Sequence, residues 1–94
     1  MKADELQKIK ESHERRIARW KEDGHKVTKY QCNGCKKMID ECQPDKDSVS
    51  GKGYWDSATI CVECGYINFV QTFPNGKTIS IDLDNGKKKT YIKP

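Results

Sequence analysis

Two short stretches, CNGC at residues 32–35 and CVEC at residues 61–64, decide how this chain folds. In each stretch two residues separate a pair of cysteines, so that one turn directs both sulfur atoms toward the same point. Four thiolates arranged in a tetrahedron are a preferred ligand set for Zn²⁺. The sequence therefore predicts one structural zinc ion, held by Cys32, Cys35, Cys61 and Cys64.

The rest of the chain is too polar to build a large apolar core. Hydrophobic residues make up 34% of the 94 residues, and leucine occurs only at Leu6 and Leu83. A short chain with this deficit buries too little apolar surface to offset its ordering entropy comfortably, and usually carries disulfides or a metal. The cysteines number five. They are therefore the first candidates for the missing cohesion.

A metal explains these cysteines better than disulfides do. Residues 1–20 are charged throughout and contain no apolar run of signal-peptide length, and no stretch approaches the length of a membrane span. We therefore expect a cytoplasmic chain with reduced thiols. An odd number of cysteines also does not suit a closed disulfide framework. Redox or disulfide pairing is the alternative.

The N-terminal part is expected to be one amphipathic helix. Residues 4–23 show helical periodicity, with Asp4 as the N-cap and Gly24 as the stop. The apolar positions recur every three or four residues and form a narrow stripe on a charged helix. The members of this stripe are Leu6, Ile9, His13, Ile17 and Trp20.

The remainder of the chain carries strand and turn signals. A loop is expected over residues 42–53, and strands are expected over residues 27–31, 54–60, 66–73, 78–83 and 88–92. The last three strands form an antiparallel meander, because Asn-Gly turns separate them. Within it, Ile79, Ile81 and Leu83 alternate with polar residues and offer an apolar face to the helix.

The two cysteine pairs, each beside a predicted strand, resemble the zinc ribbon, in which two knuckles at the ends of β-hairpins hold one zinc ion. The resemblance covers roughly residues 27–73. It implies the metal site but no particular function, because ribbons occur in transcription proteins, ribosomal proteins, nucleases and adaptors. We therefore expect an α+β fold. A helical arm over residues 1–25 precedes a zinc ribbon extended into a small antiparallel sheet over residues 26–94.

Three further side chains are weighed as ligands. Cys42 has three readings: a small buried residue, a free surface thiol or a substitute ligand. His25 precedes Cys32 by seven positions, which is not the spacing of a knuckle. His13 lies on the helix stripe and is more typical of packing or of an interface than of metal binding.

The sequence does not predict an enzyme. Four thiolates leave zinc no open position for water. The motifs of zinc deaminases and HExxH proteases are absent, as is a Walker-type phosphate loop. Two histidines, neither near a nucleophile in the sequence, leave few candidates for acid–base chemistry. We expect no catalytic residues.

Nucleic acid, or a nucleoprotein complex on which the protein acts as a regulator, is the first expected partner. The chain has a net charge of +4, a mild excess of basic residues. Lysines can contact phosphates, and exposed aromatic side chains can stack on bases. The candidate residues are Lys36, Lys37, Lys52, Tyr54, Trp55, Lys77, Lys87, Lys88 and Lys89.

A protein is the second expected partner. The helix stripe must be buried, either on the meander, against a second copy in a homodimer, or in the groove of a partner. In this hypothesis the chain is an adaptor or inhibitor without nucleic-acid contact, of a kind that suits a bacterial or phage accessory protein. Steep salt dependence would distinguish phosphate binding from apolar docking of the helix.

Overall fold

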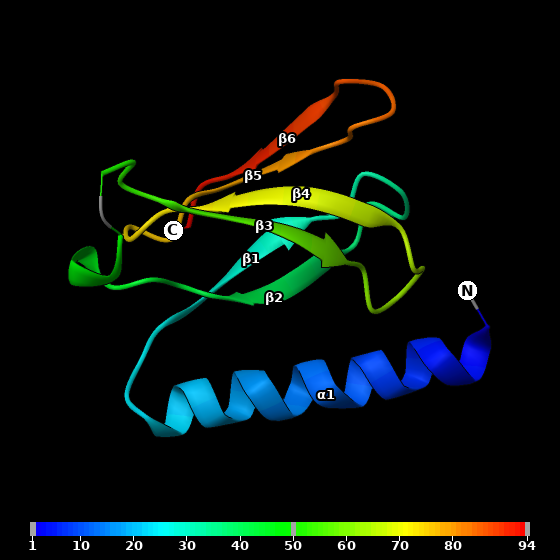
Figure 1. Cartoon of the computed structure of the whole chain (residues 1–94), viewed down its shortest axis with the longest axis horizontal. Coiled ribbons are helices and arrows are strands. Elements are labelled where there is room, and N and C mark those ends of the chain that lie inside the picture. Colours follow the sequence, from blue (N-terminus) through cyan, green and yellow to red (C-terminus); the bar gives the residue numbers. More distant parts are fainter. Residues whose placement is uncertain (1, 50, 94) are drawn as a thin grey trace.

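The structure, a computed structural model, describes residues 2–49 and 51–93, so Ser50 in the predicted loop lies outside the described residues. One helix precedes two antiparallel sheets (Figure 1), which confirms the predicted α+β class. The elements are α1 (Ala3–Glu22), β1 (Val27–Gln31), β2 (Met38–Cys42), a short 3₁₀ helix η1 (Lys46–Ser48), β3 (Trp55–Ile60), β4 (Ile67–Thr72), β5 (Thr78–Ile81) and β6 (Lys88–Tyr91).

Helix α1 begins differently from the prediction and ends as predicted. Lys2 occupies the N-cap position without a side-chain bond, so the capping role predicted for Asp4 is wrong. Asp4 instead lies in the first turn, where a carboxylate is stabilised by the helix dipole. Gly24 follows the helix with a φ of 85°. No helix of the described residues is long and apolar enough to cross a membrane.

Strands β1 and β2 form a two-stranded sheet, and β3 to β6 form a four-stranded meander in the order β3-β4-β5-β6. The sequence pattern does not predict β2. Its inward positions are Ile39 and Glu41, which are 4% and 8% exposed. A buried carboxylate at one of two inward positions hides the alternation that marks a half-buried strand.

Helix α1 packs mainly on the small sheet. It contacts β1 and β2, and its Ile17 is buried. Ile9 packs against the core. The indole Nε1–H of Trp20 donates to the carbonyl of Lys26 at 2.6 Å, and the Trp20 ring stacks on His25. Of the stripe, Ile17 is thus buried by the same chain, while its other four members are half-buried.

The apolar face predicted on β5 is inverted in the structure. Thr78 and Ser80 are completely buried, whereas Ile79 and Ile81 are half-buried and Leu83 is 68% exposed. Of the three alternatives for burying the helix stripe, packing on the isoleucine face of the meander is therefore wrong. Strand β5 contacts β1 through its polar face, whose hydroxyl groups find partners there.

Polar contacts join the two sheets. The hydroxyl of Thr78 donates to the carbonyl of Lys29 at 2.7 Å, and the hydroxyl of Thr28 donates to the carbonyl of Gly76. The ammonium group of Lys93 donates to the carbonyl of Val27 at 2.9 Å. Each of these polar groups has a hydrogen-bond partner. The layer between the two sheets can therefore be both buried and polar.

The apolar core is small and includes part of the cysteine cluster. Its buried members are Tyr30, Cys32, Ile39, Cys61, Val62 and Val70. Two of these six are candidate metal ligands, so the core is continuous with the candidate metal centre.

The substitution Ile17→Ala tests the docking of the helix. It should lower the free energy of unfolding by about 2–5 kcal/mol, because it leaves a cavity under α1. Ile92→Ala is the matched control, since Ile92 is 74% exposed, and it should change stability by less than about 0.5 kcal/mol. Urea denaturation measures both values. Equal effects would contradict the observed packing of the helix.

Candidate metal centre and adjoining groove

The four cysteines of the two pairs meet at one point. The Sγ atoms of Cys32, Cys35, Cys61 and Cys64 all lie within 4.8 Å of one another. The Cys32–Cys64 and Cys35–Cys61 sulfur separations are 3.6 and 3.7 Å. Thiolates about 2.3 Å from a central zinc would lie roughly 3.8 Å apart in a tetrahedron, whereas a disulfide needs about 2.0 Å. All of these cysteines are free, and their arrangement fits a metal ion.

Two turns of the same kind present the sulfurs. The N–H of Cys32 donates to the carbonyl of Lys37 at 3.0 Å, and the N–H of Cys61 donates to the carbonyl of Tyr66 at 2.9 Å. In each turn the fifth residue has a positive φ: 67° at Lys36 and 79° at Gly65. Each hairpin therefore ends in a tight knuckle that holds its two sulfurs in place.

A third turn repeats this knuckle without cysteines, a repeat that the sequence did not reveal. The N–H of Asp82 donates to the carbonyl of Lys87, and Gly86 has a φ of 67°. The Asp82 carboxylate takes the place of the first sulfur and accepts the N–H of Asp84 at 3.0 Å. The hydroxyl of Tyr66 also donates to this carboxylate, at 2.7 Å. Tyr66 thus ties the third turn to the second knuckle.

Gly34 allows the knuckles to approach each other. Its role is not a positive φ, because among the knuckle residues that conformation falls on Lys36 and Gly65. A Cβ atom on Gly34 would lie 2.8 Å from the Cβ of Tyr66. Because both atoms are attached to backbone, neither can move aside cheaply. A side chain at position 34 would push the two hairpins apart.

Asn68 links the sulfurs to the polar layer between the sheets. It is completely buried, and its amide donates to the Sγ of Cys32 at 3.4 Å. Its carbonyl oxygen accepts the N–H of Asn33 at 3.0 Å and the hydroxyl of Ser80 at 3.3 Å. Hydrogen bonds of this kind orient metal ligands and stabilise the thiolate form. Sequence reasoning missed Asn68, because nothing in its local sequence marks it as a neighbour of Cys32.

The thiols of the cluster differ in acidity. Burial opposes ionisation of Cys32, but hydrogen bonds from the N–H of Cys35, the Asn68 amide and the N–H of Gly34 lower the pKa of the Cys32 thiol to about 7. Burial raises the pKa of Cys61 and of Cys64. Several thiolates at this spacing therefore need a cation among them.

The other candidate ligands lie outside the cluster. Cys42 is half-buried at the end of β2, where burial and the carboxylate of Glu41 raise the pKa of its thiol. His25 stacks on Trp20 and lies 3.1 Å from Asp45. The Nδ1 of His13 accepts a hydrogen bond of 3.3 Å from the guanidinium group of Arg16.

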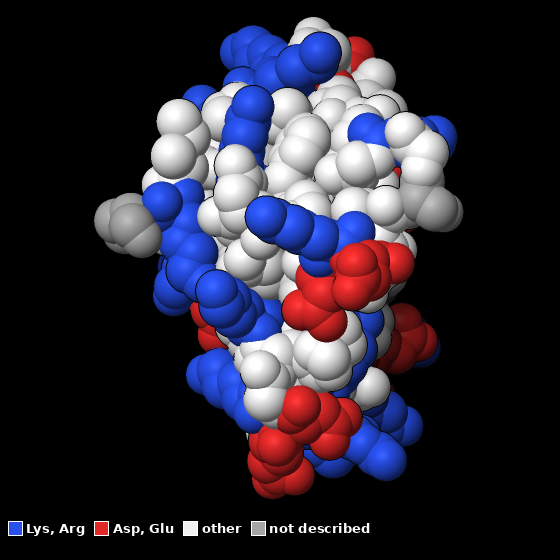
Figure 2. All heavy atoms as spheres, turned by 90° about the vertical axis from the view of Figure 1, so that its left-hand side faces the viewer, with Lys and Arg blue, Asp and Glu red and all other residues white. Residues whose placement is uncertain are grey.

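The residues predicted to contact nucleic acid are divided between two ends of the molecule. The first knuckle and the β5–β6 turn, which carry Lys36, Lys37 and residues 87–89, lie together at one end (Figure 1). The segment of residues 52–55 and the β4–β5 turn, which carries Lys77, lie toward the opposite end (Figure 1). Figure 2 looks at this second end, where basic side chains are separated by uncharged surface and acidic side chains gather toward the helix.

Most of the predicted contacts at the second end are engaged within the chain. Lys52 pairs with Asp56 at 2.8 Å. The rings of Tyr54 and Phe73 lie 5.1 Å apart, and the ammonium group of Lys77 stands over Phe73. The indole of Trp55 donates to the carbonyl of Ser48 at 3.1 Å. At the first end, Lys37 makes a longer contact of 3.9 Å with Glu63.

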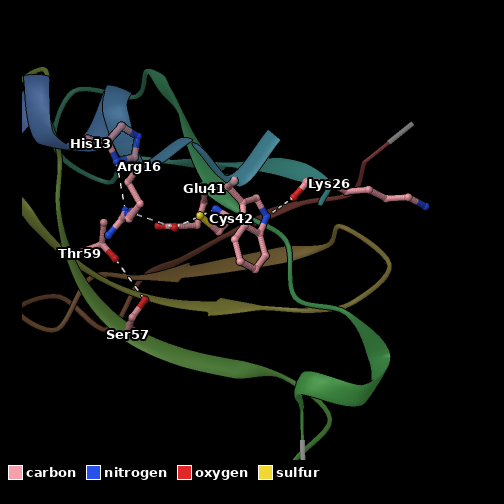
Figure 3. Close-up of polar contacts among 8 residues, drawn as sticks. His13, Arg16, Lys26, Glu41, Cys42, Ser57 and Thr59 are labelled. Atoms are coloured by element: carbon pink, nitrogen blue, oxygen red, sulfur yellow. Dashed lines mark hydrogen bonds and ion pairs between the residues drawn. The ribbon is translucent and has the colours of Figure 1, made fainter. Parts of the chain in front are cut away.

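A groove of about 720 Å³ runs between α1 and β3, beside the second knuckle. Trp20 and Trp55 line one end of it, with ring centroids 6.1 Å apart, and Ile9 and Val62 line the other. Polar groups between these ends come from α1, β2 and β3 (Figure 3). They belong to His13, Arg16, Glu41, Cys42, Ser57 and Thr59.

No protein-family model, no curated protein and no solved structure matches this chain. The class of the chain therefore rests on its own geometry, which is that of an α+β protein with a cysteine cluster able to hold a metal ion.

Substitution of the cysteines tests the metal centre. Cys61→Ser should abolish stoichiometric metal and unfold the protein, because the metal contributes about 10–16 kcal/mol, as much as the total stability of most domains. Cys42→Ser is the matched control and should keep one metal ion per chain. Elemental analysis of reduced protein and circular dichroism measure these outcomes. A folded, metal-free Cys61→Ser protein would exclude a structural metal.

Asn68→Ala tests the hydrogen bonds around the sulfurs. It should weaken metal affinity by about 10–100-fold, because the Cys32 thiolate loses a donor. Asn75→Ala, in the exposed turn after β4, should leave the affinity unchanged. Competition with a chromophoric chelator measures both. Unchanged affinity in Asn68→Ala would show that Asn68 acts on the fold alone.

Proposed function

We propose that this chain is a non-catalytic protein of the zinc-ribbon class that holds one structural zinc ion and binds a protein partner in the groove between α1 and β3. The choice of zinc rests on the donor set, since four thiolates within one cluster suit Zn²⁺ better than hard cations, which prefer oxygen. A fully thiolate-ligated zinc ion has no open position for a substrate. A binding role is therefore favoured over catalysis.

The groove is the observation that carries this proposal. Two tryptophans, Trp20 and Trp55, line its one end, and aromatic side chains of this size are enriched at protein interfaces. Three members of the helix stripe expected to dock into a partner, Ile9, His13 and Trp20, are half-buried and line this groove. In this proposal, the zinc ion fixes the hairpins, and the hairpins fix one wall of the groove.

Nucleic acid is the second candidate partner. The surface proposed to bind it is limited to the end of the molecule that carries the first knuckle and the β5–β6 turn. Lys87, Lys88 and Lys89 form no ion pair with any residue in 2–49 or 51–93, and Lys36 lies on a turn at the same end. Lys87, Lys88 and Lys89 are therefore available to contact phosphates of a nucleoprotein complex that the chain regulates, whereas the ammonium group of Lys36 already donates to the carbonyl of Asn33 at 2.8 Å. This surface is distinct from the groove, so the two candidates can be tested separately.

Affinity capture with two opposed variants tests the proposed function. Ser57→Arg, in the groove, should abolish capture of a protein partner from the source lysate, with or without nuclease. Combined alanine substitutions of residues 87–89 should leave it intact, as should Thr90→Arg, a matched change on the opposite edge strand. If nuclease removes every partner, or if Ser57→Arg captures the same proteins as the unchanged chain, the groove is not the binding surface.

A further inference from the structure

Strand β3 presents its backbone edge to the groove. It is an outer strand of the four-stranded sheet, paired with β4 on one side only. A strand that turns a face toward a groove contributes every second residue, because side chains alternate between faces. All six residues of β3 line this groove. The groove is therefore open to the peptide groups of β3 as well as to its side chains.

The unpaired peptide groups of β3 can be assigned from the ladder. The N–H of Cys61 donates to the carbonyl of Tyr66, and in an antiparallel pair bonded and non-bonded positions alternate. Counting back along the register, Asp56, Ala58 and Ile60 direct their N–H and C=O groups away from β4. Apart from its ladder with β4, β3 forms no main-chain hydrogen bond with any of the described residues.

The two outer strands of the meander differ in their protection. Proteins discourage strand addition with lysines, prolines or bulges on an edge. Strand β6 carries Lys88 and Lys89, whereas β3 has no lysine and no proline. The one charged side chain of β3, Asp56, is paired with Lys52. Helix α1 lies across the groove from β3 and blocks the approach of a second sheet to this edge. A single extended chain can still enter the groove and reach β3.

The length of the groove fits a short extended segment. Trp20 follows Ile9 by 11 positions, which is about 16 Å along a helix that rises about 1.5 Å per residue. An extended chain rises about 3.3 Å per residue, so about five residues span this distance. The side chains that line the two ends of the groove are apolar. An occupant would therefore place apolar side chains near both of its ends.

Arg16 and Glu41 place opposite charges between these apolar ends. Its side chain is 57% exposed, and one of its nitrogens lies 3.6 Å from Glu41 and 3.3 Å from His13. Glu41 also accepts the N–H of Cys42 at 2.9 Å, so its carboxylate is shared. Figure 3 shows Arg16 reaching from α1 toward Thr59 of β3. A guanidinium group has five N–H donors, which leaves several free for a carboxylate in the groove.

We propose that the groove binds an extended segment of a partner protein, which adds to the free edge of β3 and carries an acidic side chain flanked by apolar side chains two positions away on each side. The peptide groups of Asp56, Ala58 and Ile60 bind its main chain, and Arg16 binds its carboxylate. This inference rests on the proposed function and specifies the partner. A second copy of this chain does not fit by pairing β3 with β3, because each β3 edge lies under its own helix.

Synthetic peptides test the strand addition directly. The probe is a capped, fluorescent nine-residue peptide with the central sequence Val-Thr-Glu-Thr-Val, titrated into the zinc-loaded full chain and followed by fluorescence anisotropy. Replacing the central Glu by Gln should weaken binding about tenfold, because a charge-assisted hydrogen bond to Arg16 is lost. Arg16→Gln should remove this difference, whereas the adjacent, exposed Arg15→Gln should preserve it. Equal affinities of the Glu and Gln peptides for the unchanged chain would overturn the role of Arg16.

N-methylation distinguishes a strand from any other bound conformation. Methyl groups on one alternate set of backbone nitrogens should abolish binding, and methyl groups on the other set should be tolerated, because one edge of the segment faces β3. Equal effects of the two sets would overturn strand addition, as would failure of every peptide to bind. If Ser57→Arg still abolishes capture of a lysate partner in that case, the proposed function stands and the strand mode fails. If it does not, both fail.

Discussion

The meeting of four sulfur atoms at the tips of two hairpins is the constraint on which the rest of this structure depends. Cys32 and Cys61 belong both to this cluster and to the small buried core, so the metal centre and the apolar core cannot be separated. A metal ion held by this cluster would give a chain with so few apolar side chains the cohesion that larger domains obtain from burial. The positions of both sheets, and through β1 and β2 the position of α1, follow from this junction.

The polar layer between the sheets is the second consequence of a short, polar chain. Thr78, Ser80 and Asn68 are completely buried, and each forms hydrogen bonds to backbone or to polar neighbours. Such a layer contributes less to stability than apolar packing but demands well-defined geometry. It also reaches the metal centre through Asn68. The orientation of the sulfurs and the docking of the meander are therefore parts of one network.

Function in this molecule is proposed to lie beside the metal and not at it. The knuckles anchor the sheets, and the anchored β3 forms a groove with α1 in which Arg16 lies between two apolar ends. The third, cysteine-free turn at Asp82 shows that the same hairpin geometry can be held by a carboxylate and backbone amides. Two of the three turns thus depend on the cluster, while the third depends on Tyr66.

The sequence by itself determined the α+β class, the cysteine pairs and most strands, because these follow from spacing and periodicity over a few residues. It misassigned the faces of β5, since the partners of Thr78 and Ser80 come from segments distant in the sequence. The strand β2, with its buried Glu41, and the neighbour of Cys32, Asn68, were likewise decided by tertiary contacts. The groove arises only where α1 and β3 meet, and no local pattern could have revealed it.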